Sequence, residues 1–235
     1  MSLHFEVEKE LSLKAIGNGA IYAKRGSMIA YKGDFRFERK TMSLGRNIVR
    51  DAIHSVKKKF TGEGLDLMLA TGSGTLFLAD EGRHVGTITL QQGQRLSVES
   101  SDVLAFSKTV NTDIRMLGVG VLSQKGFFTS SFTANQGPET IAILSTGNPL
   151  VLETPCCVDP DAVVAWSGPD PSVKTDINWK TLIGKTSGES YMFEFKQPGY
   201  IVVVQPCERS HDDDDGSDSP TKALGSLSNL FDALS

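Results

Sequence analysis

Side chains that could perform acid–base or metal chemistry are far apart in this 235-residue sequence. No two histidines have the close spacing of a metal site or of a catalytic helix. His84 follows Asp80 and Glu81, but the run Asp-Glu-Gly-Arg-His is typical of a polar hairpin turn. The sequence therefore predicts neither a metal centre nor an acid–base catalyst. The four histidines are His4, His54, His84 and His211.

The potential nucleophiles lack the neighbours that would activate them. Cys156 and Cys157 are adjacent and Cys207 stands alone, an odd number with none of the spacings of a disulfide framework or a zinc site. Neither Cys156 nor Cys207 has a neighbouring histidine. Ser73 lies between two glycines as in a nucleophile elbow, but the residues after it read as a strand rather than a helix. We expect no enzyme activity and no cofactor, and thiols that behave as small apolar side chains in a reducing compartment.

A basic stripe is the one patterned group of charges. Between Phe37 and Gly62 apolar residues recur at steps of three and four, which predicts a helix. Its other face carries Arg46, Arg50, Lys57, Lys58 and Lys59. The favoured interpretation is a solvated helix face, and the alternative is a contact surface for an anionic partner such as RNA.

The distribution of charge argues against nucleic acid as a partner. The chain has a formal net charge of -4, and the segment from Cys207 onward supplies -5 of it, from seven acidic residues against Arg209 and Lys222. The rest of the chain is therefore near neutral, at +1. Nucleic-acid-binding domains usually carry a marked basic excess, because their affinity comes largely from neutralising phosphates.

The elements that must position these residues are strands. Most of the sequence from Leu65 to Gln205 reads as short apolar runs cut by glycine-bearing turns, which is typical of an all-β sandwich or barrel. Three runs end in alanine followed by an aromatic residue, and each is followed by a glycine-led block and another apolar strand. We therefore predict three tandem related β-units in a sandwich or double-stranded β-helix-like body with pseudo-threefold symmetry, with Ala30, Ala105 and Ala165 buried at equivalent positions. The three runs are Met28-Ile29-Ala30-Tyr31, Val103-Leu104-Ala105-Phe106 and Val163-Val164-Ala165-Trp166.

Composition divides the chain into three segments. Residues 1–206 form a single β-rich domain, residues 207–222 an acidic disordered linker, and residues 223–235 an amphipathic tail. The apolar residues of the tail recur at helical spacing and could dock against a groove on the same body, on a neighbouring subunit or on a protein partner. The alternative is a frayed tail with incidental leucines. The tail residues in question are Leu224, Leu227, Leu230, Phe231 and Leu234.

Five short motifs occur in a characteristic order between about residues 10 and 206. Together they resemble the family of altered inheritance of mitochondria protein 24, whose bacterial members are of unknown function. The resemblance implies a fold similar to that of the trp RNA-binding attenuation protein, built as three tandem β-units, and often a homotrimer. The middle copy departs from the pattern, since Gln124-Lys125-Gly126 stands where the other copies have Gly-Glu. The motifs are Gly26-Ser27-Met28-Ile29-Ala30, Gly62-Glu63-Gly64-Leu65, Gly72-Ser73-Gly74, Val103-Leu104-Ala105 and Gln197-Pro198-Gly199-Tyr200-Ile201.

These features lead to two functional hypotheses. The first is a non-catalytic oligomeric scaffold or protein-interaction module, most simply a homotrimer. The alternative is an RNA-binding regulator that acts through the basic face of residues 46–59. The opening residues have no signal-peptide pattern, and no apolar run approaches the ~20 residues of a membrane span, so we expect a cytoplasmic protein.

Overall fold

The computed structural model describes residues 3–43, 64–117, 127–174 and 191–209. Within these ranges the chain consists of antiparallel strands and two short 3-10 turns, which confirms the predicted all-β class. The helix was predicted between Phe37 and Gly62, but residues 37–43 continue the strand Met28–Ser43. The rest of that stretch, with its basic stripe, and the tail from residue 210 onward lie outside the described residues.

The elements follow one another in this order: β1 (Leu3–Glu8), β2 (Ser12–Lys24), β3 (Met28–Ser43), β4 (Gly64–Leu78), β5 (His84–Leu90), β6 (Arg95–Glu99), η1 (Ser100–Asp102), β7 (Val103–Ser107), β8 (Asn111–Leu117), β9 (Phe127–Thr133), β10 (Glu139–Ser145), β11 (Leu150–Glu153), β12 (Cys156–Val158), η3 (Pro160–Ala162), β13 (Val163–Ser167), β14 (Ser172–Lys174), β15 (Met192–Phe195) and β16 (Ile201–Val204).

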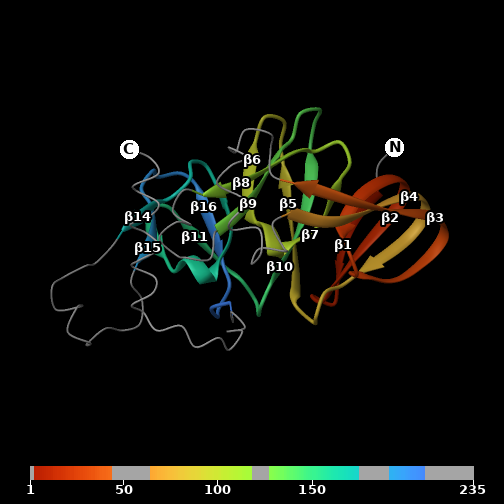
Figure 1. Cartoon of the computed structure of the whole chain (residues 1–235), viewed down its shortest axis with the longest axis horizontal. Helices are drawn as coiled ribbons and strands as arrows, with labels where there is room; N and C mark the ends of the chain where they lie inside the picture. The colour runs from red at the N-terminus through yellow and green to blue at the C-terminus, as the bar shows by residue number, and fades with distance from the viewer. Residues whose placement is uncertain (1–2, 44–63, 118–126, 175–190, 210–235) are drawn as a thin grey trace, which may run out of the picture.

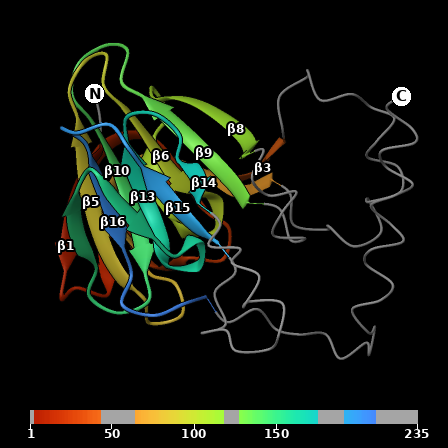
Figure 2. The ribbon, with the colours of Figure 1, turned by 90° about the vertical axis from the view of Figure 1, so that its left-hand side faces the viewer.

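The strands form three sheets arranged along the long axis of the molecule (Figure 1). The first has the order β3-β4-β2-β7-β10-β5, with β1 added on β2. The second has the order β11-β16-β13-β6-β9-β8, and Figure 2 shows β16, β13, β6, β9 and β8 side by side across one face. The third is the small sheet β12-β15-β14 at the end of the molecule opposite to β3.

Each of the three Ala-aromatic runs begins a strand with the same local pairing. β3 pairs with β4, β7 with β10 and β13 with β16, and in each pair the register shifts next to the alanine. The shift leaves the residue before the alanine unpaired, which is the geometry of a β-bulge. The paired residues are Met28 with Leu78 and Ala30 with Phe77, Val103 with Ile143 and Ala105 with Ala142, and Val163 with Val204 and Ala165 with Val203.

A second pairing also recurs with one register. β2 pairs with β7, so that Ala23 lies opposite Ala105. β6 pairs with β13, so that Val98 lies opposite Ala165. The β2–β7 pairing holds the first sheet together and the β6–β13 pairing holds the second, and each joins strands that are distant in sequence.

Burial of the three alanines differs from the prediction in one case. Ala105 and Ala165 are fully buried, as predicted, but Ala30 is exposed. The reason is the position of β3, which is an edge strand of the first sheet and has β4 as its one partner among the described strands. Ala105 and Ala165 lie in strands that are paired on both sides.

Large apolar side chains fill the space between the sheets. Phe106 is completely buried, with its ring centroid 4.9 Å from that of Phe132 and 5.4 Å from that of Tyr22. Trp166 is also completely buried, and its ring centroid lies 6.0 Å from that of Phe195. Burying one such side chain contributes about 1.5–3 kcal/mol, so these aromatic residues hold the layers together.

The Gly72-Ser73-Gly74 motif serves the close approach of two strands. Gly74 lies opposite Gly33 in the β3–β4 pair, and both have positive φ angles, +138° and +109°. A Cβ atom on Gly74 would lie 2.0 Å from the carbonyl oxygen of Lys32, which leaves no room for a side chain. Ser73 therefore lies inside a continuous strand and not at a strand-to-helix turn.

Candidate functional site

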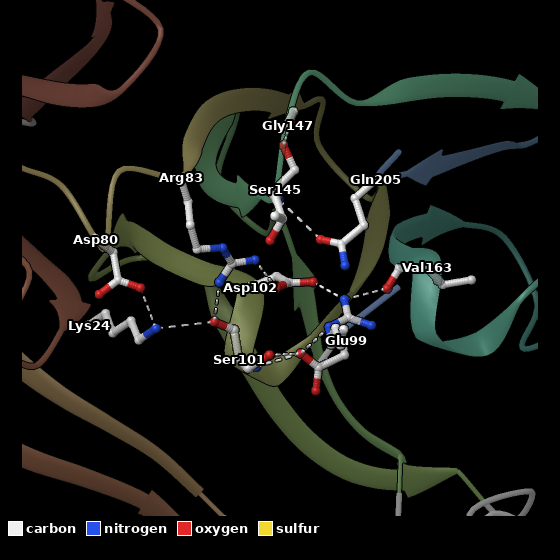
Figure 3. Close-up of polar contacts among 12 residues, drawn as sticks. Lys24, Asp80, Arg83, Glu99, Ser101, Asp102, Ser145, Gly147, Val163 and Gln205 are labelled. Carbon is white, nitrogen blue, oxygen red and sulfur yellow. Dashed lines mark hydrogen bonds and ion pairs between the residues drawn. The ribbon is translucent and has the colours of Figure 1, made fainter. Parts of the chain in front are cut away.

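A buried carboxylate organises the polar interior of the protein. Asp102 ends η1, and its side chain is fully buried. Arg83 pairs with its Oδ1 atom and Arg209 with its Oδ2 atom, so each carboxylate oxygen has a guanidinium partner (Figure 3). A buried charge is tolerated when it is paired and hydrogen-bonded in this way.

Arg209 ties the end of the described chain to the third Ala-aromatic strand. Its Nη2 atom donates to the carbonyl of Val163 at 2.6 Å, and its Nη1 atom donates to the carbonyl of Asp161 at 3.1 Å. Burial disfavours the charged form of Arg209, but the carboxylates of Asp102 and Glu99 outweigh it and raise the pKa of Arg209 above its usual range. The guanidinium is therefore a permanent cation of the interior.

Glu99 caps η1 and adds a second carboxylate. Its Oε2 atom accepts a hydrogen bond from the backbone N–H of Ser101 at 2.8 Å and lies 3.9 Å from the Nε atom of Arg209. Burial raises the pKa of Glu99, and the negative charge of Asp102 raises it further, against the lowering effect of Arg209.

A third ion pair connects this group to β2. The Nζ atom of Lys24 lies 2.6 Å from Asp80 and donates to the carbonyl of Ser101 at 3.4 Å. Asp80 and Arg83 come from the same turn, so that turn contacts both β2 and η1. We call Lys24, Asp80, Arg83, Glu99, Asp102 and Arg209 the Asp102 cluster; its three cations and three carboxylates balance, and it joins β2, η1 and the segment after β16.

Neutralising Glu99 is expected to change the pH dependence of stability. The folded-state pKa of Glu99 is raised, so the folded chain binds a proton more tightly than the unfolded chain, and stability falls as the pH rises from about 4.5 through the folded pKa. Glu99→Gln keeps the acceptor for Ser101 without the charge. We expect its free energy of unfolding to exceed that of the unchanged protein at pH 8 and the difference to shrink towards pH 4. Urea unfolding at both pH values measures this, and an equal difference at the two would contradict it.

The segment before His84 forms the predicted polar turn, but the turn is not a hairpin, because β4 and β5 do not pair with each other and β5 pairs with β10 instead. The N–H of Arg83 donates to the carbonyl of Asp80 at 2.9 Å, and Glu81 and Gly82 have positive φ angles. His84 begins β5 opposite Ser145, away from any metal-like grouping, and the described residues hold no set of three or more metal-ligating side chains. The thiols were expected to be buried as small apolar side chains, but Cys157 and Cys207 are exposed and Cys156 is half-buried. Burial, followed by the neighbouring Cys157, raises the pKa of Cys156, which disfavours its thiolate.

A groove of about 760 Å³ opens between β5 and β6 on one side and the ends of β13 and β16 on the other. Ile88, Leu90 and Tyr200 contribute apolar walls, and Arg95 lies at its margin. A smaller hollow of about 170 Å³ lies next to it and shares Ser167, Pro169 and Tyr200 with it.

The margin of this groove carries excess positive charge. Both Arg95 and Arg115 donate to the hydroxyl of Ser131 at 3.0 Å, and both approach Asp170, at 3.9 and 3.1 Å. Two guanidinium groups thus share one carboxylate on a partly exposed surface. An acidic group on a bound partner would complete the charge balance.

The candidate binding residues of the sequence analysis all belong to segments that the structure does not describe. Arg46, Arg50, Lys57, Lys58 and Lys59 lie outside the described residues, as do Leu224, Leu227, Leu230, Phe231 and Leu234. The Asp102 cluster and the Arg95–Arg115 pair were both missed. Residues that contact each other in these groups are separated by up to 107 positions along the chain, as Asp102 and Arg209 are, so no local spacing reveals them.

The class of protein that this architecture defines is an all-β body whose antiparallel sheets are continuous across successive Ala-aromatic strands. The sequence profile of the family described as Mitochondrial biogenesis AIM24 matches residues 7–207, and the chain belongs to that family.

Comparison with solved structures supports the fold. An X-ray structure of a Streptococcus pyogenes protein is similar over 97% of this chain and 98% of its own, with a TM-score of 0.57 and 16% sequence identity. No curated protein matches the sequence. The described residues include no helix long and apolar enough to cross a membrane.

Proposed function

We propose that this protein is a non-catalytic scaffold that acts as a homo-oligomer, with a trimer as the favoured state, in the cytoplasm. Three related β-units underlie it, residues 12–78, 84–145 and 150–204. The observation that carries the proposal is the repeated inter-strand register, because one pairing joins the first unit to the second and the same pairing joins the second to the third. A fold that connects its units by edge pairing is suited to connecting whole chains in the same way.

The arrangement of buried charges supports a role in binding rather than catalysis. In the Asp102 cluster the cations and carboxylates are engaged with one another, and they tie units together. A general acid or base needs an ionisable group that faces a substrate, and these groups face their ion-pair partners instead. No cofactor is part of the proposal.

The groove beside Arg95 is the proposed site for a protein partner. Apolar walls with an arginine pair at the margin would hold an extended segment that carries acidic side chains. The amphipathic tail, 223–235, stays a predicted docking element, and the RNA-binding alternative through residues 46–59 also stays a prediction. Salt-sensitive retention on RNA would favour that alternative.

Light scattering tests the assembly. At micromolar concentration we expect a mass about three times the 25.4 kDa of one chain, because edge strands that have no second neighbour among the described strands would be covered in the oligomer. Dilution should shift the mass downward as association is lost. A mass of 25.4 kDa throughout the micromolar range would overturn the proposal.

A further inference from the structure

Within the described residues, a strand pairing between units occurs twice and is missing at a third place. In the first unit the strand before the Ala-aromatic strand is β2, and it pairs with β7 of the second unit. In the second unit the corresponding strand is β6, and it pairs with β13 of the third unit. In the third unit the corresponding strand is β12, which precedes β13. Among the described strands β12 pairs with β15 alone, and β3 pairs with β4 alone. In the described part of the chain, two strands therefore lack the second neighbour that their counterparts have, β12 and β3.

Exposure at β3 matches a missing neighbour. Ile29 is 62% exposed and Tyr31 49%, whereas their counterparts Leu104 and Phe106 in β7 are fully buried. The same holds for the counterparts in β13, where Val164 and Trp166 are 0% exposed. β3 thus carries apolar residues like those of β7 and β13, but no second strand among the described residues covers them. Exposed apolar residues of this kind are typical of an interface seen on an isolated chain.

The edge at β12 shows the complementary difference. Leu96 and Ser97 of β6 are buried, whereas the corresponding Cys156 and Cys157 are half-buried and exposed. Val158, which corresponds to Val98, is buried and packs in the core cluster with Phe193. β12 is therefore anchored on its inner face and open along its edge.

The partner for these edges is a second copy of the chain. β14 and β15, in the sheet that contains β12, lie at one end of the long axis, and β3 lies at the other (Figure 1). The two edges cannot meet within one molecule without rebuilding the fold. We propose that β12 of one copy pairs antiparallel with the start of β3 of the next copy. This joins the third sheet of one copy to the first sheet of the next, and the strand order across the junction, β14-β15-β12-β3-β4-β2, repeats the order β8-β9-β6-β13-β16-β11 of the second sheet.

The internal pairs fix the register of this interface. Ala23 lies opposite Ala105 and Tyr22 opposite Phe106, and in the second pair Val98 lies opposite Ala165 and Ser97 opposite Trp166. Transferring the register places Val158 opposite Ala30 and Cys157 opposite Tyr31 of the neighbouring copy. The interface is head-to-tail, so it closes into a ring when the rotation between copies allows it. This inference rests on the proposed homo-oligomer and specifies its contact surface.

Cysteine cross-linking tests the register directly. In a Cys156→Ser, Cys207→Ser background, the remaining Cys157 faces position 31 of the next copy, and Tyr31→Cys should give covalently linked chains on oxidation with copper phenanthroline. The matched control is Lys32→Cys in the same background, because side chains alternate faces along a strand. We expect about tenfold more linked chains from Tyr31→Cys than from Lys32→Cys, since a disulfide needs Cβ atoms about 4 Å apart.

A second pair of cysteine variants, with the opposite expected result, keeps the test valid if one variant fails to fold. With Cys157→Ser and Cys207→Ser, the retained Cys156 should link to Lys32→Cys and not to Tyr31→Cys. Light scattering on the unmodified protein separates the two proposals. An oligomer that shows no register-specific linking in either set would overturn this interface and leave the scaffold proposal standing, whereas a monomer would overturn both.

Discussion

Asp102→Ala is expected to lower the free energy of unfolding by about 3–5 kcal/mol, because it leaves two buried guanidinium groups without their shared carboxylate. Arg83 and Arg209 are 14% and 17% exposed, so water cannot replace the lost partner fully. For a chain of this length the melting temperature should fall by roughly 6–20 °C. Urea unfolding followed by tryptophan fluorescence measures the free energy.

Asp66 provides a matched control for this substitution. It also lies between two arginines, at 2.6 Å from Arg25 and 3.3 Å from Arg39, but its side chain is 35% exposed and those of the arginines more so. Asp66→Ala should therefore change stability by no more than about 1 kcal/mol. If the two substitutions destabilise the protein equally, burial does not set the strength of the Asp102 cluster and our account of it is wrong.

The strands were predictable because their signals are local. Glycine turns and apolar runs act over a few residues, and they located the strands that contain Ala30, Ala105 and Ala165. Burial was not equally predictable, since the same local sequence lies at a sheet edge in one case and between two strands in the others. Whether a strand acquires a second neighbour depends on the rest of the chain.

The Asp102 cluster could not be predicted from the repeated pattern. Asp102 occupies the position before the Ala-aromatic strand, where the other units have Ser27 and Ala162. The same position thus precedes all three Ala-aromatic runs, but only Asp102 is charged. Arg209 falls within residues 207–222, the segment predicted to be a disordered acidic linker, yet its side chain is mostly buried against Asp102. The composition of that segment gives no sign of this contact. Where a single charged side chain lies depends on tertiary contacts, and the repeated sequence pattern does not predict those contacts.

Phe106→Ala should be the most damaging change in the apolar core, with a loss of about 3–5 kcal/mol. The ring is fully buried between Tyr22 and Phe132, so its removal leaves a cavity at the junction of the first two units. Urea unfolding gives the loss, with Val151→Ala on the exposed edge strand β11 as a control expected within about 0.5 kcal/mol.

The equivalent positions extend this prediction into a test of the open edge. Trp166→Ala should resemble Phe106→Ala, because Trp166 is likewise fully buried in a strand paired on both sides. Tyr31→Ala should cost less than about 1 kcal/mol in chains diluted until they are monomeric, since nearly half of this side chain is exposed there. At concentrations where chains associate, the same substitution should weaken assembly. A large decrease in the free energy of unfolding of monomeric Tyr31→Ala would mean that β3 is already covered within one chain. The edge of β3 would then not be available to pair with a second copy.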